Sequence, residues 1–255
     1  KSQYVEIALL AKSGNKWAVL WNEEGLGTEV DSVRFGSMYG ADASTLIVGY
    51  ANANLAEKYL AVYQYERESG CLQRTDQRPY YEYALADFTG SGTDDLAVLS
   101  PAQEDEPMQV TLLTVQEQTL QRVTSVRLDS LLQSCAQLCT SLYGGEYSLV
   151  VDGLTSGGTL ASEQLYFDRA SGRLVSYGDR LGVDLPTLTT RVGTMLSSRD
   201  VDEDGAVEIP VVLGNVSAFS TEQRMQWVSF YDFASIEEYQ NNFEKETVQP
   251  GSQIP

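Results

Sequence analysis

Five short apolar runs, each opened by a polar residue and closed by a turn signal, divide the chain. They read EIALLA from Glu6, TLIVGY from Thr45, DLAVLS from Asp95, SLVVDG from Ser148 and EIPVVL from Glu208. Apolar runs of this length, bounded by polar turn residues, predict buried strands. Their first residues lie 39 to 60 positions apart, so the pattern is a long and irregular internal repeat.

Further strand candidates flank these runs. Aromatic and β-branched segments follow them, reading KWAVLW, KYLAVYQY, QVTLLTV, QLYFDR and MQWVSFYDF. Other candidates precede four of the runs, reading SVRFGSM, YYEYALAD, AQLCTSLY and VGTMLSSRD. The segments YERESGCL (65–72) and FDRASGRL (167–174) share a Ser-Gly turn before a leucine, and glycine supplies the positive φ of a tight hairpin. The repeat unit is therefore four antiparallel strands.

A four-stranded unit of about 50 residues leaves its apolar faces exposed until it stacks on its neighbours, and a β-propeller is the usual solution. We therefore expect an all-β fold with a β-propeller-like domain over 1–235. Its blades are expected near 1–32, 33–79, 80–128, 136–190 and 191–235. The first unit lacks a leading strand, so either the C-terminal end closes the ring or the chain is part of a larger ring.

Two segments fit this scheme poorly. In 129–140, leucines and cysteines recur at helical spacing after Asp129 and Ser130, which suggests a short helix between units, although AQLCTSLY overlaps it as a strand candidate. Cys135 and Cys139 could pair across one turn of such a helix, but packing as small apolar residues is favoured. Residues 236–255 form a C-terminal extension or tail.

Composition narrows the function classes. The chain carries 17 Lys and Arg against 36 Asp and Glu, a formal charge of −19, which opposes binding to nucleic acid. Histidine is absent, which removes the commonest general base and transition-metal ligand. No run is long and apolar enough to span a membrane, and the stretch KSQYVEIALLAKSG does not have the pattern of a cleavable signal segment. We expect a monomer.

The stretch RDVDEDGAVEIP (199–210) crowds acidic residues around Gly205. Counting Asp200 as position 1, Asp202, Asp204 and Glu208 fall at positions 3, 5 and 9, and the Ala206 carbonyl is available at position 7. This spacing wraps oxygen atoms around a hard cation, while the glycine permits the sharp bend. The sequence therefore predicts a structural calcium site that cancels the repulsion between these carboxylates.

The pattern DxDxDGxxE between two strands resembles the FG-GAP or VCBS repeat of integrin α-subunit propellers and of many secreted bacterial proteins. A second copy, DFTGSGTDDLAVL, keeps Asp87, Thr89, Ser91 and Asp95 at positions 1, 3, 5 and 9. Two carboxylates are replaced by hydroxyls there, so calcium would bind more weakly or not at all, and hydroxyl-to-backbone bonds could hold the turn alone. The equivalent stretches of two other units, SMYGADAST and TSLYGGEYS, keep glycines but lack a full set of ligands. In the first unit, Glu6 is the one residue of the loop pattern that remains.

The sequence as a whole also resembles uncharacterised lipoproteins of Gram-positive bacteria. This resemblance implies an extracytoplasmic location, secreted or on the cell surface. We expect a non-catalytic binding or scaffold module that presents loops to a protein or a glycan. The alternatives are a carbohydrate-active hydrolase or lyase with its site in the central depression of the ring, and a spacer within a longer surface protein. Asp94 and Asp95 cannot flank one glycosidic bond, because neighbours in a strand point to opposite faces.

Overall fold

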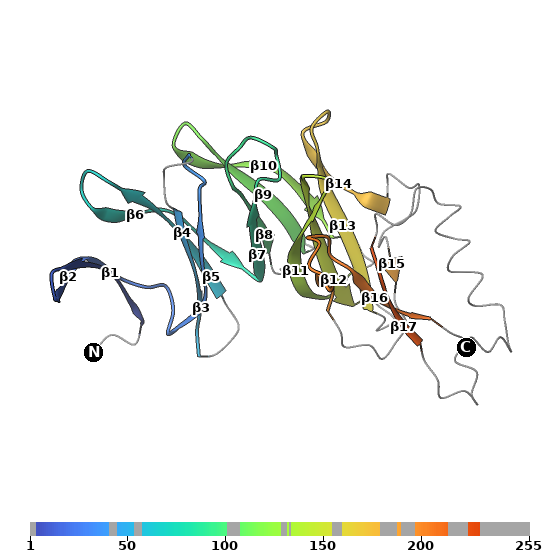
Figure 1. The fold of residues 1–255 in the computed structure, drawn as a ribbon, viewed down its shortest axis with the longest axis horizontal. Coiled ribbons are helices and arrows are strands. Elements are labelled where there is room, and N and C mark those ends of the chain that lie inside the picture. Colours follow the sequence, from blue (N-terminus) through green and yellow to red (C-terminus); the bar gives the residue numbers. More distant parts are fainter. Residues whose placement is uncertain are drawn as a thin grey trace, which may run out of the picture. The chain divides into compact units, whose positions relative to one another are not determined.

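The structure, a computed structural model, describes residues 4–40, 45–53, 58–100, 108–128, 132, 134–154, 160–178, 188–189, 197–213 and 224–229. The chain divides into two compact units, Lys1–Ser125 and Val126–Pro255. Each unit is built from antiparallel strands joined in chain order (Figure 1). Among the described residues, no helix has the length and apolar character needed to cross a membrane.

The first unit contains one hairpin and two four-stranded sheets. The hairpin consists of β1 (Glu6–Ser13) and β2 (Lys16–Glu24). The first sheet consists of β3 (Glu29–Gly36), β4 (Thr45–Ala51), β5 (Lys58–Glu66) and β6 (Cys71–Tyr80). The second sheet consists of β7 (Glu82–Ala86), β8 (Asp95–Ser100), β9 (Gln109–Gln116) and β10 (Thr119–Arg127).

The second unit contains a larger sheet and a hairpin. The sheet consists of β11 (Ser134–Tyr143), β12 (Glu146–Leu154), β13 (Leu160–Asp168) and β14 (Arg173–Ser176), and β15 (Leu188–Thr189) pairs with β13. The hairpin consists of β16 (Ile209–Leu213) and β17 (Arg224–Val228). The prediction of an all-β chain with four-stranded antiparallel sheets is confirmed. The expected extension at 236–255 lies outside the described residues.

The structure corrects the reading of the first repeat. A Ser-Gly turn joins the third and fourth strands of two sheets, with Gly70 at φ +66° and Gly172 at φ +68°. A shorter turn, Gly14 and Asn15, joins β1 and β2, with Gly14 at φ +61°, and β2 lies against β6. The expected boundary between residues 32 and 33 falls inside β3.

The helix expected within 129–140 is wrong for residues 134–140, which belong to β11. Pairing with β12 runs from Ser134 opposite Leu154 to Tyr143 opposite Glu146. Residues four apart in a strand are separated by about 13 Å, so Cys135 and Cys139 cannot form a disulfide there. Cys139 is a free thiol, and burial, aided by the charge of Asp152, raises its pKa to about 12.

Two apolar cores hold the first unit together. One lies between the β3–β6 and β7–β10 sheets, and it is formed by Met38, Ile47, Leu60, Val62, Tyr80, Tyr83, Leu96, Val98 and Leu113. The other lies on the opposite face of β3–β6, where Ile7, Leu9 and Trp21 of the hairpin pack on Val48, Tyr50, Ala61, Tyr63 and Leu72. The β3–β6 sheet thus has apolar side chains on both faces, as expected of a sheet stacked between others.

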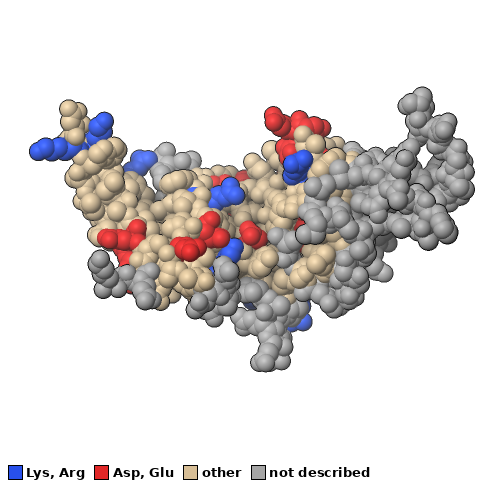
Figure 2. All heavy atoms as spheres, turned by 90° about the horizontal axis from the view of Figure 1, so that it is seen from below, with Lys and Arg blue, Asp and Glu red and all other residues tan. Residues whose placement is uncertain are grey.

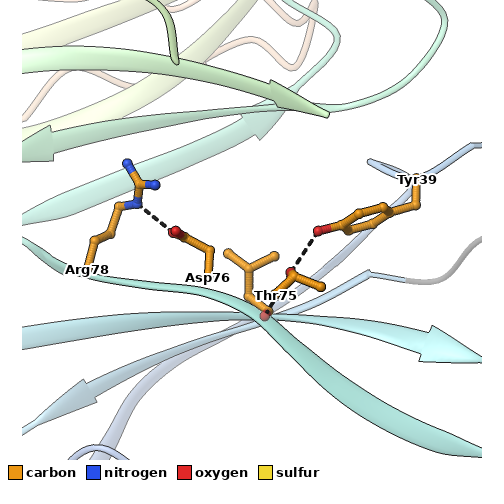
Figure 3. A network of polar contacts seen from close by, with 5 residues as sticks. Tyr39, Thr75, Asp76 and Arg78 are labelled. Atoms are coloured by element: carbon orange, nitrogen blue, oxygen red, sulfur yellow. Dashed lines mark hydrogen bonds and ion pairs between the residues drawn. The ribbon is translucent and has the colours of Figure 1, made fainter. Parts of the chain in front are cut away.

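A bulge in β6 tethers the segment that follows β3. The register shifts so that Val62 faces Asp76 and Tyr63 faces Arg74, which leaves Thr75 as the extra residue. The Thr75 hydroxyl accepts a hydrogen bond from the Tyr39 hydroxyl at 2.7 Å and donates to the Val62 carbonyl at 3.2 Å (Figure 3). Next to the bulge, Arg78 donates to Asp76 at 2.6 Å. Bulges commonly redirect a side chain in this way.

Candidate metal site

The acidic loop is closed at its base by a short antiparallel bridge. The Arg199 N–H donates to the Glu208 carbonyl and the Glu208 N–H to the Arg199 carbonyl, both at 3.0 Å. The Arg199 guanidinium also lies 5.2 Å from the ring centre of Trp227 in β17, a cation–π distance. These contacts bring positions 1 and 9 of the loop together at the point where the chain enters β16.

Inside the loop, carboxylates accept hydrogen bonds from the backbone. Asp200 accepts from the Gly205 N–H at 2.9 Å, and Glu208 accepts from the Val201 N–H at 2.8 Å. Asp204 accepts from the Ala206 N–H at 2.8 Å. Backbone donors partly offset the negative charge, so the turn has a defined shape before any ion is considered.

Three of the predicted ligands converge. One carboxylate oxygen from each of Asp200, Asp202 and Glu208 lies within 4.8 Å of the other two. Asp204 is not among these three; one of its carboxylate oxygens accepts the hydrogen bond from the Ala206 N–H, and the Ala206 residue is buried. A set of oxygen ligands without nitrogen or sulfur suits a hard cation such as calcium.

The charges in the loop act on Glu208. Partial burial raises the pKa of the Glu208 carboxyl, and the charges of Asp202, Asp204 and Asp200 raise it further, while the hydrogen bond from Val201 opposes them. A carboxylate whose ionised form is disfavoured by neighbouring carboxylates is the arrangement that a bound cation would relieve.

The second predicted loop has the same backbone frame. The Gly92 N–H donates to Asp87 at 2.8 Å, the counterpart of the bond from Gly205 to Asp200. Position 4 has positive φ in both loops, at +72° for Gly90 and +65° for Glu203. Position 6 also has positive φ in both loops, at +86° for Gly92 and +96° for Gly205.

The second loop differs in what holds its interior. Ser91 donates to Asp87 through its N–H at 2.8 Å, and the Ser91 hydroxyl lies 3.0 Å from the Thr93 hydroxyl. Hydroxyl-to-backbone bonds were one way in which this turn could be held without calcium, and the Ser91 hydroxyl does lie 3.3 Å from the Thr93 carbonyl oxygen. Most of the backbone bonds in the loop, however, go to carboxylates. Asp95 is fully buried and accepts from the Thr89 N–H at 2.8 Å, while its other oxygen has no hydrogen-bond partner among the described residues.

Burial raises the pKa of Asp95, with a further rise from the charge of Asp87, while the hydrogen bond from the Thr89 N–H opposes it. Asp94, its neighbour, points elsewhere and accepts two hydrogen bonds from Ser37, from its N–H at 2.7 Å and from its hydroxyl at 3.1 Å. Ser37 directly follows β3, so the loop of the β7–β10 sheet is tied to the first strand of the β3–β6 sheet.

The acidic loop is anchored to β11 in a comparable way, which sequence reasoning missed. The Leu142 N–H donates to the Gly205 carbonyl at 2.8 Å, and the Val207 N–H donates to the Ser141 hydroxyl at 2.9 Å. Before the loop, Ser198 donates to the buried carboxylate of Asp152 through its N–H at 2.7 Å and through its hydroxyl at 2.6 Å. Asp152 also accepts from Ser162 at 2.7 Å.

The signal for this anchor is the presence of polar residues in strands. Asp152, Ser162 and Gln164 interrupt apolar strands and are nevertheless buried. Buried polar groups are hydrogen-bonded as a rule, so such residues imply a polar segment packed on that face, but they do not identify it.

The surface charge is distributed in clusters. On the face drawn in Figure 2, Asp and Glu side chains of the described residues gather in separate groups with Lys and Arg between them.

The sequence matches no model of a known protein family. A search of the curated proteins also finds no match.

Proposed function

We propose that Asp200, Asp202 and Glu208 hold a structural calcium ion, with Asp204 and the Ala206 carbonyl completing the site. The chain would then be a non-catalytic scaffold or binding module that works outside the cytoplasm and presents loops to a protein or a glycan. Extracellular modules typically bind calcium with a Kd of about 10⁻⁴ to 10⁻³ M. Such an affinity would make the module depend on external calcium.

One observation carries this proposal: three carboxylate oxygens from three ligand positions lie within 4.8 Å of one another. Solvated acidic residues gain nothing from such proximity, because like charges repel. The backbone N–H groups of Val201 and Gly205 hold two of these carboxylates inward, and this preorganisation lowers the entropy cost of binding an ion.

We also propose that the stacked sheets are blades of a β-propeller. Two features support this reading. In each unit, an acidic-type loop is bonded to the end of the first strand of the preceding sheet, at Ser37 after β3 and at Leu142 in β11. In the first unit, successive sheets pack face to face through apolar cores, which is how blades bury their faces.

The test is thermal unfolding of the full chain in calcium and in EDTA. At a calcium concentration ten times the Kd, binding should stabilise the folded state by about 1.4 kcal/mol. Replacing two ligands (Asp200→Asn with Asp202→Asn) should abolish the calcium-dependent rise in Tm. Glu203→Gln is the matched control, because it removes a loop charge at a position that supplies no ligand. A Tm that ignores calcium in the wild-type protein would refute the site.

A further inference from the structure

One face of the sheet that contains β11 and β12 is polar. Gln137, Cys139 and Ser141 are alternate residues of β11, so their side chains point to the same face. Gln137 lies opposite Asp152 of β12, and residues paired across a ladder share a face. Asp152 and Ser141 are almost fully buried, so another segment of the chain covers this polar face.

The segment that contains the acidic loop, residues 198–209, provides this cover, and we call it the cover segment. One end is held at Ser198, which donates to Asp152 at 2.7 and 2.6 Å and whose carbonyl accepts from the Gln137 side chain at 3.1 Å. The other end is held at Val207, whose N–H donates to the Ser141 hydroxyl at 2.9 Å. In Figure 1 the segment that leads into β16 accordingly lies beside β11.

Cys139 lies between these two anchors. Along β11 it is flanked by Gln137 and Ser141, which bond to opposite ends of the cover segment. It is a free thiol and only partly exposed, and its Sγ lies 3.7 Å from the Val150 carbonyl oxygen. The cover segment therefore shields the thiol from a bulky reagent for as long as it stays on the sheet.

Two of the three converging carboxylates adjoin the anchors. Asp200 follows Ser198 by two positions, and Glu208 directly follows Val207. Two hydrogen bonds of 3.0 Å between Arg199 and Glu208 join the arms of the loop. Oxygens of Asp200 and Glu208 lie within 4.8 Å of each other. Their repulsion acts to separate the two anchors, whereas a cation between them would pull the anchors together.

We infer that the acidic loop is a calcium-controlled latch for the cover segment, an inference that rests on the proposed calcium site. With the ion bound, the cover segment stays on the polar face and shields Cys139. Without the ion it opens more often, and water takes over its hydrogen bonds to Gln137, Ser141 and Asp152. Such an exchange of partners changes the free energy little for each bond. Opening also separates Asp200 from Glu208, so the ion binds the closed form selectively and shifts the balance towards it.

Thiol labelling tests the latch. The full chain with Cys135→Ser is treated with fluorescein maleimide in calcium or in EDTA, and mass spectrometry of its peptides follows Cys139 and Cys71 separately. Calcium at ten times its Kd should slow the labelling of Cys139 about tenfold, because the ion stabilises the closed form. Cys71, the first residue of β6 in the other unit, is the internal control and should label at the same rate in both conditions.

Variants separate the latch from general changes in stability. Asp200→Asn with Asp202→Asn removes both the ligands and their repulsion, so Cys139 should label more slowly than in wild type in EDTA, and calcium should not change the rate. Ser198→Ala removes a hydrogen bond to the buried Asp152 and should speed the labelling of Cys139 with and without calcium. Ser197→Ala, which changes an exposed neighbour, is the matched control and should have no effect.

The latch and the calcium site fail in different ways. Calcium uptake in a titration without slower labelling of Cys139 would overturn the latch and leave the calcium site intact. Absence of calcium uptake would overturn both. The latch is also overturned if calcium slows Cys71 and Cys139 equally, which would indicate a general stabilisation, or if Ser198→Ala and Ser197→Ala label at the same rate.

Discussion

The two acidic-type loops share a backbone and differ in charge. In both, the N–H at position 6 bonds to the Asp at position 1, and positions 4 and 6 have positive φ. At positions 3 and 5, one loop has Thr89 and Ser91 where the other has Asp202 and Asp204. In both loops the carboxylate at position 9 also accepts a backbone N–H. The shape of the turn therefore does not need carboxylates at positions 3 and 5, and under the proposed function these additional carboxylates serve a cation.

The largest effect should follow from replacing the glycine at position 6. Gly205→Ala places a side chain at φ +96° and a Cβ 3.3 Å from the Leu142 carbonyl oxygen, whereas Gly92→Ala at φ +86° meets no atom within 4 Å. A left-handed backbone costs an L-residue about 1–2 kcal/mol. Urea unfolding should therefore show a loss of that size for Gly92→Ala and a larger loss for Gly205→Ala. An equal loss in both variants would mean that the contact with β11 is unimportant.

Adding charge to the second loop should make it resemble the first. The double variant Thr89→Asp with Ser91→Asp places carboxylates at positions 3 and 5 beside Asp87 and the buried Asp95. In EDTA the added repulsion should lower stability, and calcium at ten times its Kd should restore about 1.4 kcal/mol. The double variant Thr89→Asn with Ser91→Asn is the uncharged control. Identical calcium responses in the two double variants would contradict the assigned purpose of the extra carboxylates.

Position 4 offers a smaller test. Glu203 has a positive φ where the other loop has Gly90, so Glu203→Gly should relieve strain and stabilise the protein by about 0.5–1 kcal/mol, part of the gain being offset by the greater freedom of glycine in the unfolded chain. Gly90→Ala should destabilise it by a similar amount. Both changes are measured by chemical unfolding in EDTA, and a destabilised Glu203→Gly protein would show that the Glu203 side chain makes a needed contact.

The smallest effect concerns Asp31, a carboxylate whose negative charge is stabilised by two neighbouring side chains. Asp31 accepts from the Tyr80 hydroxyl at 2.6 Å and lies 3.1 Å from Lys58 Nζ. Partial burial favours its neutral form, but these two partners outweigh burial and lower the pKa of Asp31 below 3.8. A lowered folded-state pKa stabilises the protein above the unfolded value, and this stabilisation is lost as the pH falls through the folded value.

Asp31→Asn should therefore destabilise the protein slightly at pH 7, regardless of calcium. The difference from wild type in urea unfolding should shrink as the pH falls below 3.8. A difference that persists unchanged at low pH would mean that the effect of the substitution is steric.

Local patterns predicted much of this molecule. The oxygen spacing from Asp200 to Glu208 and the apolar runs in β4, β8 and β12 depend on neighbours in sequence, and the strands and the loop frame were predicted from them. The bond from Ser198 to Asp152 joins residues 46 positions apart, and no local signal encodes such a partner. In the sequence, Asp152 within an apolar strand indicates only that its carboxylate needs a hydrogen-bond donor, and it does not identify that donor.

Other features were ambiguous because one pattern serves two structures. Cys135, Leu138 and Cys139 suit a helix as well as a strand, and only pairing with β12 decides between them. The run beginning at Glu6 suits a second strand as well as a third strand, and its local sequence does not distinguish them. The extra residue Thr75 depends on register between two strands, which composition does not encode.

Isothermal titration of calcium into the metal-free full chain tests the central claim most directly. We predict one saturable site for the wild-type protein, its loss in the Asp200→Asn, Asp202→Asn double variant, and its retention in Glu203→Gln. The account is contradicted if the wild-type protein takes up no calcium, or if the double variant binds as tightly as the wild type.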